Sequence, residues 1–178
     1  MIEYRVGHDP DFWSPDPGVL SHRFALGNVS KVTAAAPPLV VVGMNPSHAA
    51  ETQADRTVNR VIDASVERGY GGWIMLNLYP ERSPKPKLLS KFRPELSKLN
   101  CEAIEQVLRR HSVTEVLGAW GNRPHKTLEL AEADVWALFG RMGVKVFTWD
   151  PLTAKGNPRH PHPPGRPLPM IGPKVYLN

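Results

Sequence analysis

Side chains that could do chemistry follow four apolar stretches of the chain. They are Asn45 and Ser47 after residues 39–43, Asn77 at the end of residues 73–77, Asn122 after residues 113–120, and Arg159 and His160 in the loop after residues 144–149. If these stretches are parallel strands of one sheet, their carboxyl ends share a rim, where open α/β sheets bind ligands. The sequence therefore predicts one site built from amide, hydroxyl, guanidinium and imidazole groups.

The asparagines suit recognition of an amide-like ligand. Asn77 follows Trp73-Ile74-Met75-Leu76, so its amide must satisfy two donors and an acceptor near a buried strand end, and it can pair in two directions with a base edge. Its alternative role is a bond to the neighbouring loop backbone. Asn45 either holds an attacking water or a substrate carbonyl, or it initiates the Asn-Pro turn.

Ser47 is a candidate contact for phosphate or substrate, and its alternative role is that of a loop or helix cap. A nucleophilic role has no support, because the G-x-S-x-G elbow that would expose the hydroxyl is absent. No G-x-x-x-x-G-K or G-x-G-x-x-G motif follows the first strand either. We therefore expect no glycine-loop grip on a nucleotide and no cofactor. No Cys/His set has zinc spacing, so we also expect no metal.

His160 is the catalytic candidate among the histidines. A neutral imidazole would donate to a developing anion and a protonated one would stabilise it by charge, either of which serves cleavage at a glycosidic or acyl centre. The alternative is a surface histidine, to which we assign His8, His22, His111 and His125, while His48 and His162 are candidates by adjacency alone.

Charged and hydroxyl groups at two further places could reach the rim. Thr57 and Arg60 open a helix behind Asp55, which is itself either a site residue or only the helix N-cap. Arg82 belongs to a basic loop with Lys85 and Lys87. That loop is either solvated or a contact for phosphate groups.

Composition limits the class of protein. The 178 residues are 41% hydrophobic and 22% charged, which predicts a single globular domain over residues 1–178. A net charge of +5 modestly favours a polyanionic partner. One cysteine cannot form an intrachain disulfide, and neither a secretory segment nor an apolar run of membrane-spanning length occurs, so we expect a cytoplasmic protein without a membrane partner.

The elements that must position the site alternate along residues 37–150. Continuous β-branched and aromatic runs predict strands at 39–43, 73–79, 113–120 and 144–149, and spacings of three and four predict helices at 55–68, 95–111 and 125–141. This order predicts a three-layer α/β/α sandwich with a mainly parallel, four-stranded central sheet. Residues 1–36 are predicted to form an antiparallel extension or edge ribbon, and the Pro-rich residues 151–178 to wrap the surface.

Four segments carry a resemblance to a known family: GMNPSHAAETQADRTVNRVI, GYGGWIMLNLYPERSPKP, LGAWGN and GNPRHP. In order, over about residues 20–163, they resemble an uncharacterised bacterial and phage family, domain of unknown function 1643. The chain has His48 where that family usually has Thr and Ala50 where Asp is usual. The resemblance implies site positions at Asn45, Pro46, Ser47, Asp55, Thr57, Arg60, Asn77, Arg82, Trp120, Gly121, Arg159, His160 and Pro161.

More distantly, the same set is similar to the uracil-DNA glycosylase superfamily. The counterparts are its first-strand loop at Gly43–Pro46, its L-L-L-N strand at Ile74–Asn77, its L-W-G strand at Ala119–Gly121 and its His-Pro loop at Arg159–Pro161. That similarity implies a glycosylase-like sandwich in which Asn45 orients water, Asn77 reads the flipped base and His160 stabilises the departing base. The serine after the histidine motif is missing, and the leucine that wedges DNA has no clear equivalent.

The expected function is recognition of a nucleobase, with hydrolysis of the N-glycosidic bond of a modified or damaged base in DNA as the leading activity. The alternatives are an enzyme acting on a free nucleoside, nucleotide or modified base, and a noncatalytic module that binds nucleic acid or a nucleotide. The expected partner is DNA or a nucleotide, and the expected catalytic residues are Asn45 and His160. The expected substrate-binding residues are Met44, Pro46, Ser47, Thr57, Arg60, Asn77, Arg82, Trp120, Gly121, Asn122 and Arg159.

Overall fold

A parallel four-stranded core forms the centre of the sheet in the computed structural model, which describes residues 2–178. Its strands are β3 (Pro38–Gly43), β4 (Gly72–Asn77), β5 (Glu115–Gly118) and β6 (Lys145–Thr148). Their spatial order is β4-β3-β5-β6, with Val41 paired to Met75 on one side and Leu117 on the other. The four predicted strands and their parallel arrangement are confirmed.

Three helices connect these strands within the described residues. They are α1 (Arg56–Glu67), α2 (Pro94–Arg110) and α3 (Lys126–Met142), and a short 3-10 turn η1 (Pro86–Leu88) precedes α2. Asp55 begins α1 by accepting a hydrogen bond from the Val58 N–H at 2.9 Å. Gly143 ends α3 in the left-handed conformation, with φ 67°. The predicted helices are confirmed to within a residue at each end.

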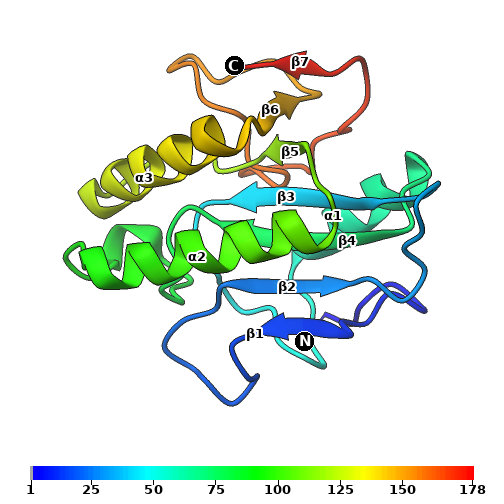
Figure 1. Ribbon diagram of the computed structural model, residues 1–178, viewed down its shortest axis with the longest axis horizontal. Coiled ribbons are helices and arrows are strands. Elements are labelled where there is room, and N and C mark those ends of the chain that lie inside the picture. Colours follow the sequence, from blue (N-terminus) through cyan, green and yellow to red (C-terminus); the bar gives the residue numbers. More distant parts are fainter. Residues whose placement is uncertain (1) are drawn as a thin grey trace.

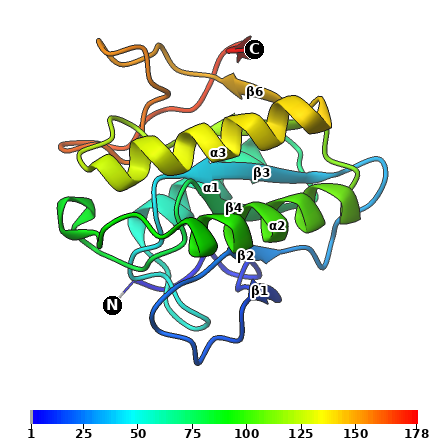
Figure 2. The same cartoon turned by 60° about the vertical axis from the view of Figure 1, so that its left-hand side comes forward.

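Helices cover both faces of the sheet because neighbouring strand residues point to opposite sides. Leu39 and Val41 pack with α1 on one face, whereas Val40 and Val42 pack with α2 and α3 on the other. Figure 1 and Figure 2 both show α2 and α3 together on one side of the sheet and α1 on the other. The α/β class and its layered arrangement are therefore confirmed.

Antiparallel strands extend both edges of the sheet to seven strands in all. On one side β2 (Ala25–Asn28) pairs with β4, and β1 (Phe12–Ser14) pairs with β2, as the predicted N-terminal extension requires. On the other side β7 (Val175–Tyr176) pairs with β6. The N-terminal and C-terminal segments thus lie at opposite edges (Figure 1).

The strand β7 corrects the prediction that residues 151–178 only wrap the surface. Most of this segment is irregular, but its last residues pair Tyr176 with Phe147. A two-residue strand is too short to produce an alternating sequence pattern, and it forms because β6 otherwise leaves its backbone groups unpaired. No helix of residues 2–178 is long and apolar enough to cross a membrane.

Candidate functional site at the carboxyl ends of the parallel strands

Three of the predicted strand exits meet at one rim, on the left in Figure 1, where the β3 arrow points. A methyl group placed on Gly43 would lie 3.0 Å from Oδ1 of Asn77, because the two residues are paired across β3 and β4. A methyl group on Gly121 would lie 3.3 Å from Cβ of His160 and 4.0 Å from Cε of Met44. The exits of β3, β4 and β5 therefore contact one another and the loop that carries His160.

Asn77 holds a buried amide that the rest of the protein does not satisfy. The residue is 2% exposed, and its Nδ2 has no hydrogen-bond partner among the described residues. Its main-chain oxygen is satisfied, since Nδ2 of Asn100 donates to it at 2.9 Å. A buried donor without a partner destabilises a protein by about 1–3 kcal/mol. The Asn77 side chain is thus oriented toward the glycine at position 43 and retains a donor for a ligand.

Asn45 joins the loops that follow β3 and β4. Its Nδ2 donates to the carbonyl oxygens of Pro46 at 3.0 Å, Glu81 at 3.3 Å and Ser83 at 2.8 Å. These contacts fix the amide, and Oδ1 is left as the acceptor of this side chain, with no bond to it from residues 2–178. Asn45 therefore has the turn-forming role and also presents a carbonyl oxygen.

His160 is held as a neutral imidazole against Gly121. Gly121 has φ 68° and its N–H donates to the Pro158 carbonyl at 2.9 Å, which brings the histidine loop onto the end of β5. Burial lowers the pKa of His160 below 6.5, and this effect outweighs the backbone of His162 and the Asp55 carboxylate, which raise it. The His162 N–H donates to Nδ1 at 3.2 Å, so the ring proton lies on Nε2. Nε2 is then a hydrogen-bond donor at neutral pH.

Asp55 lies between the two halves of the rim. One carboxylate oxygen caps α1, as described above, while the charge acts on His160 and also on Arg23 and Tyr4. The loop of residues 44–55 therefore links two parts of the rim, one that contains His160 and one that contains Arg23, which precedes β2.

Arg82 meets a second arginine, Arg23, that sequence reasoning did not select. Both guanidinium groups donate to the carbonyl oxygen of Ala49, with Nη2 of Arg82 at 3.3 Å. Arg23 is only 6% exposed and its buried Nε has no partner in the part of the chain described. Burial and the Arg82 charge lower the pKa of Arg23 to about 10, so it stays charged at neutral pH. Arg23 precedes a short strand in a segment of weak periodicity, which gave no sequence signal.

Four other predicted site residues are occupied by structural contacts. Arg60 donates to the carbonyl oxygens of Leu168 and Pro169 and so anchors the C-terminal tail. Nε of Arg159 donates to the Pro151 carbonyl, and Oδ1 of Asn122 accepts from Thr153 and Asn157. Trp120 is buried edge-on against Trp136 of α3. These contacts hold the loops around the rim and do not bring the four side chains together.

The remaining predicted site residues lie on the loop after β3 and in the first turn of α1. Oγ of Ser47 is 3.1 Å from Nδ1 of His48, which is exposed. Pro46 is buried and its carbonyl accepts from Asn45 and from the Ser83 N–H. Thr57 lies half-buried in the first turn of α1.

The hollow on this side of the molecule is lined by arginines and apolar residues rather than by the asparagines and His160. It holds about 20 Å³ of free space, and its walls include Trp13, Leu26, Arg23 and Arg82. Within residues 2–178, no group of three or more His, Cys, Asp or Glu side chains could hold a metal ion.

Comparison with known proteins identifies a family. No curated protein and no solved structure matches the chain. A model of the family described as Protein of unknown function (DUF1643) matches residues 23–162, which include every rim residue described above. The chain therefore belongs to this family.

Proposed function

We propose that the protein recognises a nucleobase and hydrolyses its N-glycosidic bond, on a sandwich related to that of the uracil-DNA glycosylase superfamily. The observation that carries the proposal is the buried, unpartnered Nδ2 of Asn77 at the end of β4. A buried unsatisfied donor calls for a specific explanation, and a base carbonyl or ring nitrogen provides its missing acceptor.

The roles of the other groups follow from their free atoms. Nε2–H of His160 donates to the departing base, where negative charge develops as the bond between the base nitrogen and the sugar carbon breaks. A neutral imidazole can take this role because its Nε2–H donates a hydrogen bond although the ring carries no charge. The lowered pKa of His160 supports this assignment.

The water that attacks the sugar carbon is oriented by Asn45. Its Nδ2 is committed to three carbonyl oxygens, so Oδ1 accepts a hydrogen bond from the water. The water oxygen bonds to the sugar carbon, the bonding electron pair leaves with the base, and the water proton is released to solvent or to the base. If the base lies in DNA, it must first leave the helical stack.

The test is a screen for release of bases from DNA containing modified bases, run beside a panel of free nucleosides and nucleotides. Release from DNA alone supports the leading activity, and turnover of free nucleosides or nucleotides alone supports the small-molecule enzyme. Binding without turnover in either panel supports the noncatalytic module. Silence in both panels contradicts nucleobase recognition altogether.

Asn45→Ala separates catalysis from binding. We expect kcat to fall by about 100-fold while the dissociation constant of the substrate stays near its original value, because Asn45 acts mainly in the transition state. Single-turnover kinetics on the substrate found in the screen measure both quantities. Asn178→Ala is the control, since Asn178 bonds Val144 and Val146 at the amino end of the strands, away from the rim. Equal losses of affinity and rate in Asn45→Ala would refute its assigned role.

Asn77→Ala addresses recognition. The variant should lose selectivity among bases by about tenfold or more, since one hydrogen bond to the base is removed. Unchanged selectivity among bases would show that the unpartnered amide of Asn77 does not bind the base, and the proposal would lose its support.

A further inference from the structure

Arg23 is a buried charge without a counter-ion. The only hydrogen bond of its side chain within residues 2–178 goes to the Ala49 carbonyl, although a guanidinium carries five N–H donors. No carboxylate of the described residues forms an ion pair with it, in contrast to Arg5 and Arg109, which pair with Asp63 and Glu105. An uncompensated buried charge is strongly unfavourable, so its presence requires an explanation.

Arg82 adds a second positive charge at the same point. Backbone pairing joins the two segments, because the Arg23 N–H donates to the Pro80 carbonyl and the Arg82 N–H donates to the Ser21 carbonyl. Residues 23 and 82 therefore lie on the same side of this short ladder. Their side chains converge on the single acceptor at Ala49, which leaves many more donors than acceptors.

The hollow beside them admits a small group. Arg23 and Arg82 line it together with apolar atoms of Trp13, Val19 and Leu26. Its free space of about 20 Å³ exceeds the roughly 10–15 Å³ that one water-sized group needs. One oxygen atom of a ligand therefore fits inside, while the rest of the ligand lies at the open mouth.

The acidic residues near this hollow do not neutralise the arginines. Asp16 and Glu51 also line it, but both are exposed, and Oδ1 of Asp16 accepts the Gly18 N–H. Exposed carboxylates are screened by solvent and salt. Asp55 attracts Arg23 from farther away while it caps α1.

We infer that Arg23 and Arg82 form a binding site for a phosphate group. Two guanidinium groups carry a charge of about +2, which a phosphate of about −1.5 to −2 balances and a single carboxylate does not. The inference goes beyond the proposed glycosidic activity, because the site is defined by its own donors and is measured without turnover.

The experiment follows the Nε–Hε resonances of Arg23 and Arg82 by NMR in the full chain as inorganic phosphate is added at constant ionic strength. We expect saturable shifts of both resonances and none at Arg109, whose Nε already donates to Glu105. Arg82→Gln should weaken phosphate binding by about tenfold, and the control variant Arg109→Gln should leave it unchanged. An unmoved Arg23 resonance at about 10 mM phosphate, or unchanged affinity in Arg82→Gln, would overturn the site.

Two further titrations identify where the phosphate comes from. A nucleoside 5′-monophosphate and a short single-stranded oligonucleotide are each added in place of inorganic phosphate. Shifts with the monophosphate alone assign a free nucleotide, and shifts with the oligonucleotide assign a nucleic-acid backbone. If both bind in wild type and Arg82→Gln weakens neither, the inference fails.

Discussion

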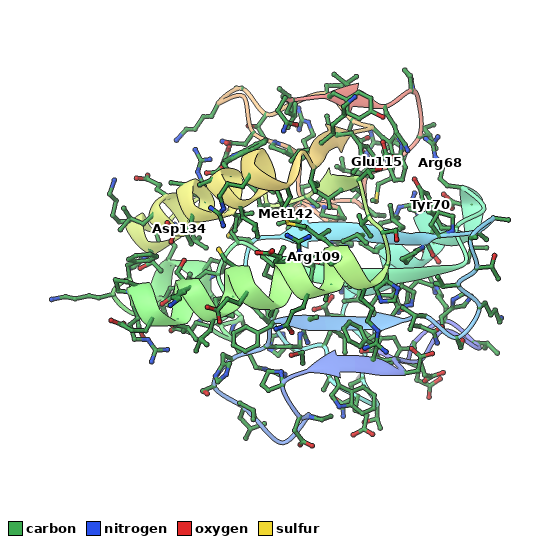
Figure 3. All side chains as sticks on the ribbon, in the orientation of Figure 1. Arg68, Tyr70, Arg109, Glu115, Asp134 and Met142 are labelled. Atoms are coloured by element: carbon green, nitrogen blue, oxygen red, sulfur yellow. The ribbon has the colours of Figure 1, made fainter. Side chains whose placement is uncertain are left out.

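The two ends of the parallel strands treat their polar groups differently. At the amino end, Glu115 of β5 accepts from Lys174 and from the Tyr176 hydroxyl, so this charge is matched, although the uncharged Nε2 of His111 and Nε1 of Trp73 have no hydrogen-bond partner among residues 2–178. Tyr70 and Glu115 lie at this end, on the right in Figure 3. At the carboxyl end, residues 2–178 offer Arg23 no carboxylate partner and the amide of Asn77 no acceptor. We therefore seek function where a charged group is buried without an ion pair, near an amide that lacks an acceptor.

The volume of a hollow does not show which end of the strands is the functional one. The hollow at the amino end holds about 130 Å³, against about 20 Å³ beside the arginines, and its walls include Pro37, Pro38 and Leu39. The larger one has both apolar walls and the polar residues His111, Ser112, Thr114 and Glu115, but no guanidinium group. The smaller one has two guanidinium groups that need an anion, so chemistry decides between them.

The largest expected effect is on the framework under the site. Asn100 is 0% exposed, and its Nδ2 donates to the carbonyl oxygens of Asn77 and Leu78. Asn100→Ala should lower the free energy of unfolding by about 3 kcal/mol, measured by chemical denaturation, because two buried acceptors lose their donor. Asn178→Ala is the counterpart at the amino end, where an exposed amide bonds Val144 and Val146, and should lose less than about 1 kcal/mol. Equal losses would break the contrast between the two ends.

Two glycines with the same backbone conformation test the contact with His160. Gly121 and Gly143 have φ 68° and 67°, but a methyl group added at Gly121 would have His160 within 4 Å, whereas one added at Gly143 would meet open space. Gly143→Ala should lose about 1 kcal/mol of unfolding free energy from backbone strain, and Gly121→Ala about 2 kcal/mol, because its methyl group also crowds the histidine. NMR of the His160 ring should change only in Gly121→Ala. An unperturbed ring in both variants would contradict the packing at the rim.

The pH dependence of stability comes next. The pKa of His160 is lowered by burial, so below about pH 6.5 the unfolded chain binds more protons than the folded one. Thermal stability should therefore fall as pH decreases through 6.5 and level off below the folded-state pKa. His160→Gln should flatten this slope in part, since burial also lowers the pKa values of His22 and His111. A slope identical to wild type would show that His160 is not desolvated.

The smallest effect is expected at the amino end. Burial opposes ionisation of Glu115, but hydrogen bonds from Lys174 and Tyr176 outweigh it and lower its pKa. The stability that this provides is present above the ordinary value of 4.5 and is lost as pH falls through the lowered one. Glu115→Gln should lower the unfolding free energy by less than about 1 kcal/mol at neutral pH, with a smaller loss in high salt. A loss insensitive to salt would mean that the cluster is not held by charge.

The sequence predicted most of the fold because long apolar runs carry a strong signal. LVVVG and WIMLN are continuous because both faces of these strands are covered, and Val58 and Ile62 repeat at the helical spacing. Strand β7 escaped prediction because two residues cannot show a period. Strand β2 lies in a segment for which only an antiparallel ribbon was expected. Just before this strand, the Arg23 N–H donates a hydrogen bond to the Pro80 carbonyl, which places Arg23 beside the loop after β4.

The candidate site was predictable only in part. Asn45, Asn77 and His160 were selected from their positions after strands, and the structure brings these strand ends to one rim. Asn122 occupies an equivalent position, yet its amide is exposed and bonded to the loop of residues 153–157. Asn45, Asn77 and Asn122 all lie at or after the end of a predicted strand, and this pattern does not distinguish an incomplete amide from a structural one.

The sequence by itself determined the order of strands and helices and the residues at the strand exits, since local periodicity and turn chemistry depend on near neighbours along the chain. Only the tertiary structure decided which of those residues are left incomplete. Within residues 2–178, Nδ2 of Asn77 lacks a partner because its buried surroundings offer no acceptor, and Arg23 meets Arg82 because distant segments pair. Burial and missing partners are properties of what surrounds a group in space, which no local pattern specifies.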